Sequence, residues 1–166
     1  MKGSNSYYRI WPFLTVVFIS LSLFSYGTAM MDYMLIYPSR LIIGENEFVG
    51  YHALLEERII PVSVMPFSVI TLINIILLFR RPVEVPLKFL IISMVCLVLD
   101  WISTIFVQIP INLQLNNGKD VALINDIISN NRGRVVLESV QAFAVIKIIY
   151  HIMKCCETYL NKSVKQ

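Results

Sequence analysis

Residues 87–110 read LKFLIISMVCLVLDWISTIFVQIP, an apolar run of 24 residues in which Asp100 is the one acidic side chain. A helix needs about 20 apolar residues to cross the hydrocarbon core of a bilayer, so this run is long enough to span it. Two further apolar runs, at residues 11–31 and 59–79, contain no charged side chain. The sequence therefore predicts several membrane-spanning helices.

The composition of the 166-residue chain agrees with a protein embedded in a lipid bilayer. Hydrophobic residues make up 57% and charged residues 15%, whereas soluble domains carry about 25% charged residues. The formal net charge is +3 and no long basic run is present, which argues against nucleic acid as a partner. The three cysteines are too few and too poorly spaced for a disulfide framework or a zinc site. We expect neither a metal nor a cofactor.

A fourth helix is predicted at residues 135–156, but it contains Glu138, Gln141 and Lys147. An amphipathic helix lying on the membrane surface is the alternative for this segment. The first run is expected to be a retained helix. The alternative is a signal peptide that is removed, because the small residues at 27–29 resemble a cleavage site. With four spans, the fold is a single all-α membrane bundle with connections at 32–58 and 111–134. Within the second connection, residues 120–129 are predicted to form a short separate helix.

The distribution of basic residues predicts how the bundle sits in the membrane. Lys and Arg are more frequent on the cytoplasmic side of membrane proteins. The side that holds both termini carries eight such residues: Lys2, Arg9, Arg80, Arg81, Lys88, Lys154, Lys162 and Lys165. The opposite side carries five: Arg40, Arg58, Lys119, Arg132 and Arg134. We therefore expect both termini in the cytoplasm and both long connections outside.

Asp100 is the most informative polar residue, because a carboxylate inside the bilayer is costly unless it faces protein or water and has a partner. It shares one helix face, at the 3.6-residue period, with Ser93, Cys96, Ser103, Thr104 and Gln108. This stripe is predicted to point into the bundle. Lys147, at a similar depth, is the predicted partner, in a structural ion pair, a proton relay or a substrate contact. The alternative is that Lys147 extends to the membrane surface and never meets Asp100.

A second polar group is predicted near the outer surface, where His52 and Glu56 are four residues apart and share a helix face. Such a pair can hold a metal, or its carboxylate can orient the imidazole for acid–base chemistry. The remaining alternative is that both side chains lie in water at the surface without a specific role. Two ligands do not make a metal site, and the second histidine, His151, is predicted at the inner surface. At the level of His52 the sequence also places Gln108, Asn112, Arg134, Glu138 and Gln141.

Several short motifs resemble a family of small four-helix bacterial membrane proteins of unknown function, itself similar to the anthrone-oxygenase-like membrane family. They are Tyr37, Pro38, Phe48, Tyr51, His52, Arg58, Ile59, Asp100, Trp101, Gln108, Pro110, Asn112, Leu115, Gly118, Asn131 and Arg134. The resemblance covers residues 10–150, approximately, and implies a bacterial cytoplasmic membrane.

For function, the resemblance implies oxidation of an aromatic molecule without a metal or flavin. His52, Gln108, Asn112 and Arg134 would then bind and deprotonate a phenolic substrate. Two positions depart from the family pattern: Asn112 stands where a histidine is common, and Arg132 where an aromatic residue is common.

Three classes of function follow from the sequence. The first is a small multi-pass membrane protein whose outer-facing polar pocket binds or oxidises an apolar or aromatic molecule. The second is a non-catalytic subunit of a larger membrane complex or homo-oligomer, although the chain lacks the G-x-x-x-G pattern of close helix packing. The third is a small transporter or channel, which would need a polar path across both leaflets.

Overall fold

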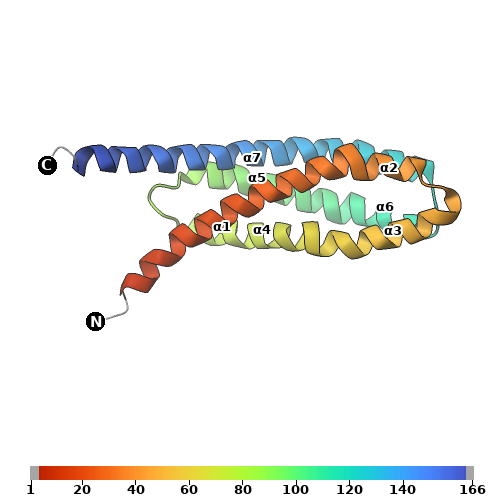
Figure 1. Ribbon diagram of the computed structural model, residues 1–166, viewed down its shortest axis with the longest axis horizontal. Helices are drawn as coiled ribbons and strands as arrows, with labels where there is room; N and C mark the ends of the chain where they lie inside the picture. Colours follow the sequence, from red (N-terminus) through yellow and green to blue (C-terminus); the bar gives the residue numbers. More distant parts are fainter. Residues whose placement is uncertain (1–3, 164–166) are drawn as a thin grey trace.

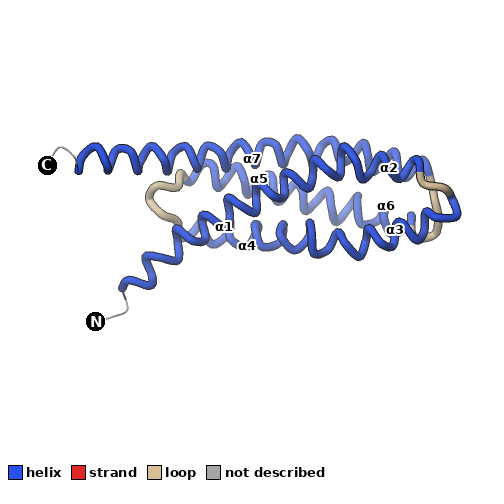
Figure 2. Tube along the Cα trace, in the orientation of Figure 1, coloured by secondary structure: helices blue, strands red, loops and turns tan. Residues whose placement is uncertain are grey.

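The computed structural model of the chain describes residues 4–163, and every regular element among them is helical (Figure 1). Ten segments form four long helical units that run side by side as a bundle (Figure 2). Segments labelled η are π-helical. The units are α1 (Ser4–Met31), η1 (Asp32–Ile36) and α2 (Tyr37–Ile42); α3 (Glu45–Ile59), η2 (Ile60–Val64) and α4 (Met65–Phe79); α5 (Leu87–Ser103), η3 (Thr104–Gln108) and α6 (Ile109–Leu115); and α7 (Val121–Ser163).

All four units are long and apolar enough to cross a membrane, which confirms the predicted all-α fold with four candidate spans. Many large apolar side chains are exposed on the bundle, as expected for a surface that faces lipid. The fourth unit packs along α1 and α5 as part of the bundle, so it is not a separate surface helix. The start of α1 and the end of α7 lie at one end of the bundle (Figure 1), and we call the opposite end the distal end.

The helices extend well beyond their predicted bounds at the distal end. The predicted connections at 32–58 and 111–134 are almost entirely helical, and only residues 43–44 and 116–120 are not. The short helix predicted at 120–129 is the beginning of α7, which continues without a break through Gly133. Polar residues that indicate loops in a soluble protein are helical here, and α2 packs against α7 in this part of the bundle.

Each of the three π-helical segments is followed, two residues after its end, by a proline: Pro38, Pro66 and Pro110. Proline has no N–H to donate, and its ring clashes with the carbonyl four residues earlier. A π-helical turn, which takes up an additional residue, accommodates this disturbance, and such turns are frequent at functional sites.

The apolar core has two parts, which lie on either side of the three π-helical segments. The larger part occupies the half nearer the termini and includes Phe18, Ile70, Leu77, Leu97, Val145 and Ile148, all fully buried. A smaller part at the distal tip joins Phe48, Leu115 and Ile124. Beside it, Lys119 Nζ donates to the carbonyls of Leu41 and Ile43, at 2.9 and 2.6 Å. These bonds connect the two non-helical segments of the distal end, residues 43–44 and 116–120.

Candidate functional site

Arg134 on α7 lies at the centre of a buried polar group between these two apolar parts. Its Nη1 donates to Gln108 Oε1 at 2.9 Å, and its Nη2 donates to Glu138 Oε1 at 3.5 Å. Its Nε lies 3.9 Å from Asp100 Oδ1. Asp100 and Glu138 are buried, with exposed fractions of 0% and 2%. One guanidinium therefore holds together side chains from α5, η3 and α7, and we call this set the Arg134 cluster.

The first helical unit completes the cluster from the other side. Ser25 on α1 donates to Glu138 Oε2 at 3.4 Å. Asp32, the first residue of η1, lies within electrostatic range of both Arg134 and Arg40. Three acidic side chains thus lie near Arg134, and one of them, Asp32, also lies near Arg40. Buried charges are tolerated when they are paired in this way, and at membrane depth they are functional candidates.

The predicted pairing of Asp100 with Lys147 is wrong, because Asp100 faces Arg134 instead. Lys147 is exposed, and its ammonium lies over the Phe143 ring at 5.0 Å from the ring centre. The helical period gives the reason. Glu138 faces the interior, and a residue nine positions later on an α-helix lies on the opposite face. Depth excludes the pairing as well, because Lys147 follows Arg134 by 13 residues, about 20 Å along α7, and Arg134 lies at the level of Asp100.

The predicted polar stripe on α5 and η3 does face the interior. Ser93, Cys96, Asp100 and Gln108 are all buried. On α1, the polar residues Thr15, Ser22 and Ser25 are buried as well. The 3.6-residue period of polar side chains therefore identified the inner face of the span that carries Asp100.

His52 on α3 belongs to a second polar group nearer the distal tip. Its Nε2 lies 3.7 Å from Glu56 Oε1, which confirms the predicted shared face, and 3.0 Å from the Asn112 carbonyl oxygen. Because a carbonyl can only accept, Nε2 carries the proton of a neutral His52. Arg40 Nη1 donates to Asn112 Oδ1 at 2.9 Å, and Phe48 stacks on the imidazole. Within residues 4–163, no group of three or more His, Cys, Asp or Glu is arranged to hold a metal ion.

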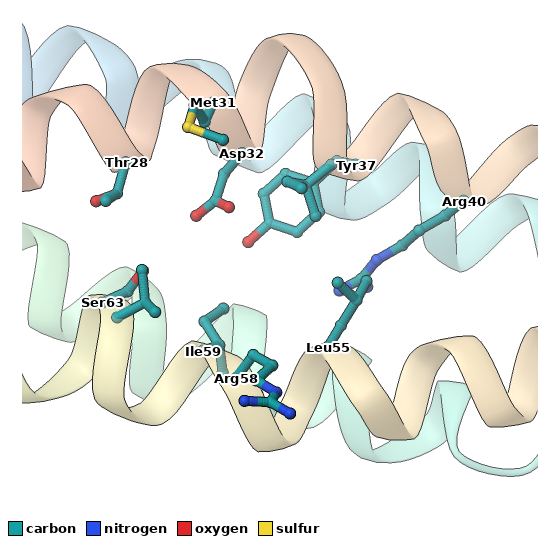
Figure 3. A pocket seen from close by; sticks show the side chains of 11 residues that line it. Thr28, Met31, Asp32, Tyr37, Arg40, Leu55, Arg58, Ile59 and Ser63 are labelled. Carbon is teal, nitrogen blue, oxygen red and sulfur yellow. The ribbon is translucent and has the colours of Figure 1, made fainter.

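Three cavities lie at the level of the π-helical segments, with volumes of about 150, 60 and 430 Å³. In the first, Asp32, Tyr37 and Arg40 project from the α1–α2 unit, opposite Leu55, Ile59 and Ser63 (Figure 3). The second adjoins Arg134 and Glu138, and the third lies between η2 and α6. Ile59 lines all three. They are therefore neighbouring compartments of one hollow region, which we call the distal cavities.

The distal cavities bring together most, but not all, of the predicted site residues. Gln108, Arg134, Glu138 and Asn112 line them. His52 lines none of the three. Its contact with the Asn112 carbonyl instead makes it a residue that positions Asn112. The candidate role of His52 in direct contact with a substrate is therefore not supported by its position.

The residues that line the cavities without having been predicted as site residues include Asp32, Tyr37 and Arg40. They fall in the segment that was expected to be a long connection. Tyr37 and Arg40 are buried, with exposed fractions of 1% and 2%. Two signals indicated that the first helix continues through this segment. A helix accepts a proline such as Pro38 in its first turn, and several residues between Met34 and Leu41 are apolar.

Comparisons of this chain with protein families, curated proteins and solved structures find no match. What the site can do is given by its donors and acceptors. Arg40 Nε, Gln108 Nε2, Arg134 Nε and both Asp100 oxygens are buried without a hydrogen-bond partner among residues 4–163. Buried polar atoms are normally paired. Of these residues, Arg40, Gln108 and Arg134 line the distal cavities, so they are the candidates to bind a hydroxyl or carbonyl group, and Arg134 can hold a negative charge beside it.

Proposed function

We propose that this bundle binds an amphipathic, largely apolar or aromatic molecule in its distal cavities. The observation that carries the proposal is the meeting of three cavities at Ile59, next to buried charged side chains. Mostly apolar cavities with a few converging polar groups are the usual form of small-molecule sites. The π-helical segments support the proposal, because they supply the lining residues Asp32, Ser63 and Gln108.

A phenol hydroxyl is chemically suited to the polar side chains that line the second cavity. This hydroxyl can donate a proton to the carboxylate of Glu138 or Asp32, and the resulting phenolate is stabilised by the Arg134 guanidinium. We assign the proton acceptor to a carboxylate because His52 lies outside the cavities, bound to Asn112. Loss of the proton makes an aromatic ring more reactive toward molecular oxygen. This is the cofactor-independent oxidation that the resemblance to anthrone-oxygenase-like proteins implies.

The apolar core favours binding over transport. A transporter or channel needs polar groups along a path that reaches both surfaces. Between the Arg134 cluster and the terminal end, the interior is filled by Phe18, Ile70, Leu97, Val145 and Ile148. Polar side chains are also buried in this half, but Asn74 and Ser93 bond to each other, and the mostly apolar filling is a poor path for a polar solute.

We also propose that both termini lie in the cytoplasm of a bacterial inner membrane and that the distal cavities lie near its outer surface. The basic side chains Arg80, Arg81, Lys88, Lys154 and Lys162 at the terminal end support this orientation; Lys2 and Lys165 lie outside the described residues. Exposed Cys156 provides the test. A membrane-impermeant maleimide should label it in inverted vesicles and not in intact spheroplasts. Labelling in intact spheroplasts would contradict the orientation.

Trp101 offers a direct measurement of binding. It lines the second and third cavities and donates through Nε1 to Thr71. The chain has two tryptophans, so Trp11→Phe leaves Trp101 as the single reporter. A dihydroxyanthraquinone, a planar phenol that accepts energy from tryptophan, should quench its emission saturably in nanodiscs. A colourless phenol should restore the emission by competition.

The control separates specific binding from simple partitioning into lipid. Arg134→Met should weaken the quenching at least tenfold, whereas Lys147→Met removes the same charge from an exposed position of the same helix and should leave it unchanged. Quenching that never saturates, or that both variants show equally, would refute the proposal. A stable partner protein that co-purifies with such a non-binding chain would favour the role of a subunit in a larger complex.

A further inference from the structure

The third cavity opens sideways, between η2 and α6. Large apolar side chains stand at its edge: Ile60, Val64, Ile109 and Leu113, with exposed fractions of 56%, 38%, 48% and 60%. On a helix that crosses a membrane, exposed apolar side chains face lipid. The apolar runs begin at Ile59 on this side of one unit and end at Pro110 on the other. The opening therefore lies where the hydrocarbon meets the headgroups.

The inner wall of the same cavity is polar and firmly held. Arg40 and Gln108 are buried, with exposed fractions of 2% and 5%. Arg40 is fixed by its Nη1 bond to Asn112, and Gln108 is fixed because its Oε1 accepts from Arg134. These bonds leave Arg40 Nε and Gln108 Nε2 without partners among residues 4–163. Two residues that line the cavity thus each carry a buried, unpaired N–H donor, and such a donor is costly unless an acceptor meets it.

We infer that the opening between η2 and α6 admits a lipid-soluble molecule from the bilayer and that Arg40 Nε and Gln108 Nε2 bind a carbonyl oxygen at its leading end. The apolar remainder of the molecule stays against Ile60 and Ile109. The inference rests on the proposed function and adds two properties to it: the molecule arrives through the membrane, and it carries a hydrogen-bond acceptor. A purely water-soluble ligand would have to pass an edge made of exposed apolar side chains.

The route is tested by narrowing the opening. The double variant Ile60→Phe with Ile109→Phe adds bulk at its edge. The matched control is Ile75→Phe with Ile102→Phe, whose exposed fractions of 42% and 49% are similar and whose side chains line none of the three cavities. Stopped-flow quenching of Trp101 in nanodiscs should show association slowed at least tenfold by the first pair and unchanged by the second. The equilibrium affinity should change less than threefold.

The carbonyl contact is tested by removing one donor. Gln108→Glu keeps an oxygen that accepts from Arg134 but replaces the Nε2 donor with an acceptor. Anthraquinone, which carries carbonyl oxygens, should bind this variant at least tenfold more weakly, whereas anthracene, which has no oxygen, should bind within twofold of the unaltered chain. The control Gln114→Glu makes the same change on the exposed face of α6 and should affect neither probe.

The outcomes distinguish this inference from the function on which it rests. If no probe binds the unaltered chain saturably, both fail. If binding is saturable and depends on Arg134, but narrowing the opening leaves association unchanged, the proposed function stands and the lateral route is overturned. Equal slowing by both double variants would also overturn the route. Equal weakening of anthraquinone and anthracene by Gln108→Glu would overturn the carbonyl contact.

Discussion

Arg134→Met is expected to lower the free energy of unfolding by about 3–5 kcal/mol, because removing one partner of a buried ion pair leaves uncompensated charge. Asp100 and Glu138 both lose the guanidinium that they approach at 3.9 and 3.5 Å. Gln108 Oε1 loses its donor at the same time. The loss is measured by titrating the protein in mild detergent micelles with sodium dodecyl sulfate and following Trp101 emission and helical circular dichroism.

Lys147→Met provides the matched control, because it makes the same substitution on an exposed position of the same helix. It should change the unfolding free energy by no more than about 0.5 kcal/mol, as is usual for surface positions. A double-mutant cycle then tests the contact with Asp100. Asp100→Asn combined with Arg134→Met should cost less than the sum of the two single variants. Additive losses would mean that these two residues do not interact.

Phe18→Ala is the second change with a large expected effect, a loss of about 3–5 kcal/mol, the usual range for removing a fully buried phenylalanine. Phe18 is 0% exposed within the apolar core that separates the Arg134 cluster from the terminal end. Close packing, more than the hydrophobic effect, holds helices together in lipid, so the cavity left behind loses contacts that lipid does not replace. The same detergent titration measures the loss.

Phe13 on the same helix is the control for Phe18, since 64% of it is exposed. Phe13→Ala exchanges one lipid-facing apolar side chain for another and should cost less than about 0.5 kcal/mol. A similar loss for the two variants would show that the buried and lipid-facing sides of α1 had been assigned incorrectly. A larger loss for Phe13→Ala would contradict the packing of α1 outright.

The spanning helices and their inner faces could be predicted from the sequence because each depends on a local pattern. Length and apolar composition identify a span. The 3.6-residue period of polar residues then identified the buried face that carries Ser93, Asp100 and Gln108. Both signals lie within one helix and need no knowledge of its neighbours. The His52–Glu56 pair was predictable for the same reason, as a contact four residues apart.

Contacts between helices were harder to predict, because they depend on rotation as well as depth. The expected partner of Asp100 was chosen by its predicted depth, but Lys147 lies about 20 Å farther along α7 than Arg134 and on the face opposite Glu138. The helical period, applied from Glu138, would have excluded it and pointed to Arg134, four residues away from Glu138 on the same face. The structure also separates His52 from the distal cavities, which no local pattern indicates.

Asp32, Tyr37 and Arg40 were missed for a different reason. Polar residues beyond an apolar run resemble a loop when only the hydrocarbon thickness is considered. The helix in fact continues through the headgroup layer and turns these side chains inward after η1. The prolines that follow the π-helical segments were visible in the sequence, but a proline predicts a disturbance in a helix without specifying its form.

The uninterrupted helix α7 has a mechanical consequence. Its 43 residues extend about 64 Å, farther than the 40–45 Å of a bilayer with its headgroups. Arg134 and Cys156 therefore stand about 33 Å apart on one stiff rod without a hinge. A small tilt of this rod about Arg134 therefore becomes a larger sideways displacement at Cys156.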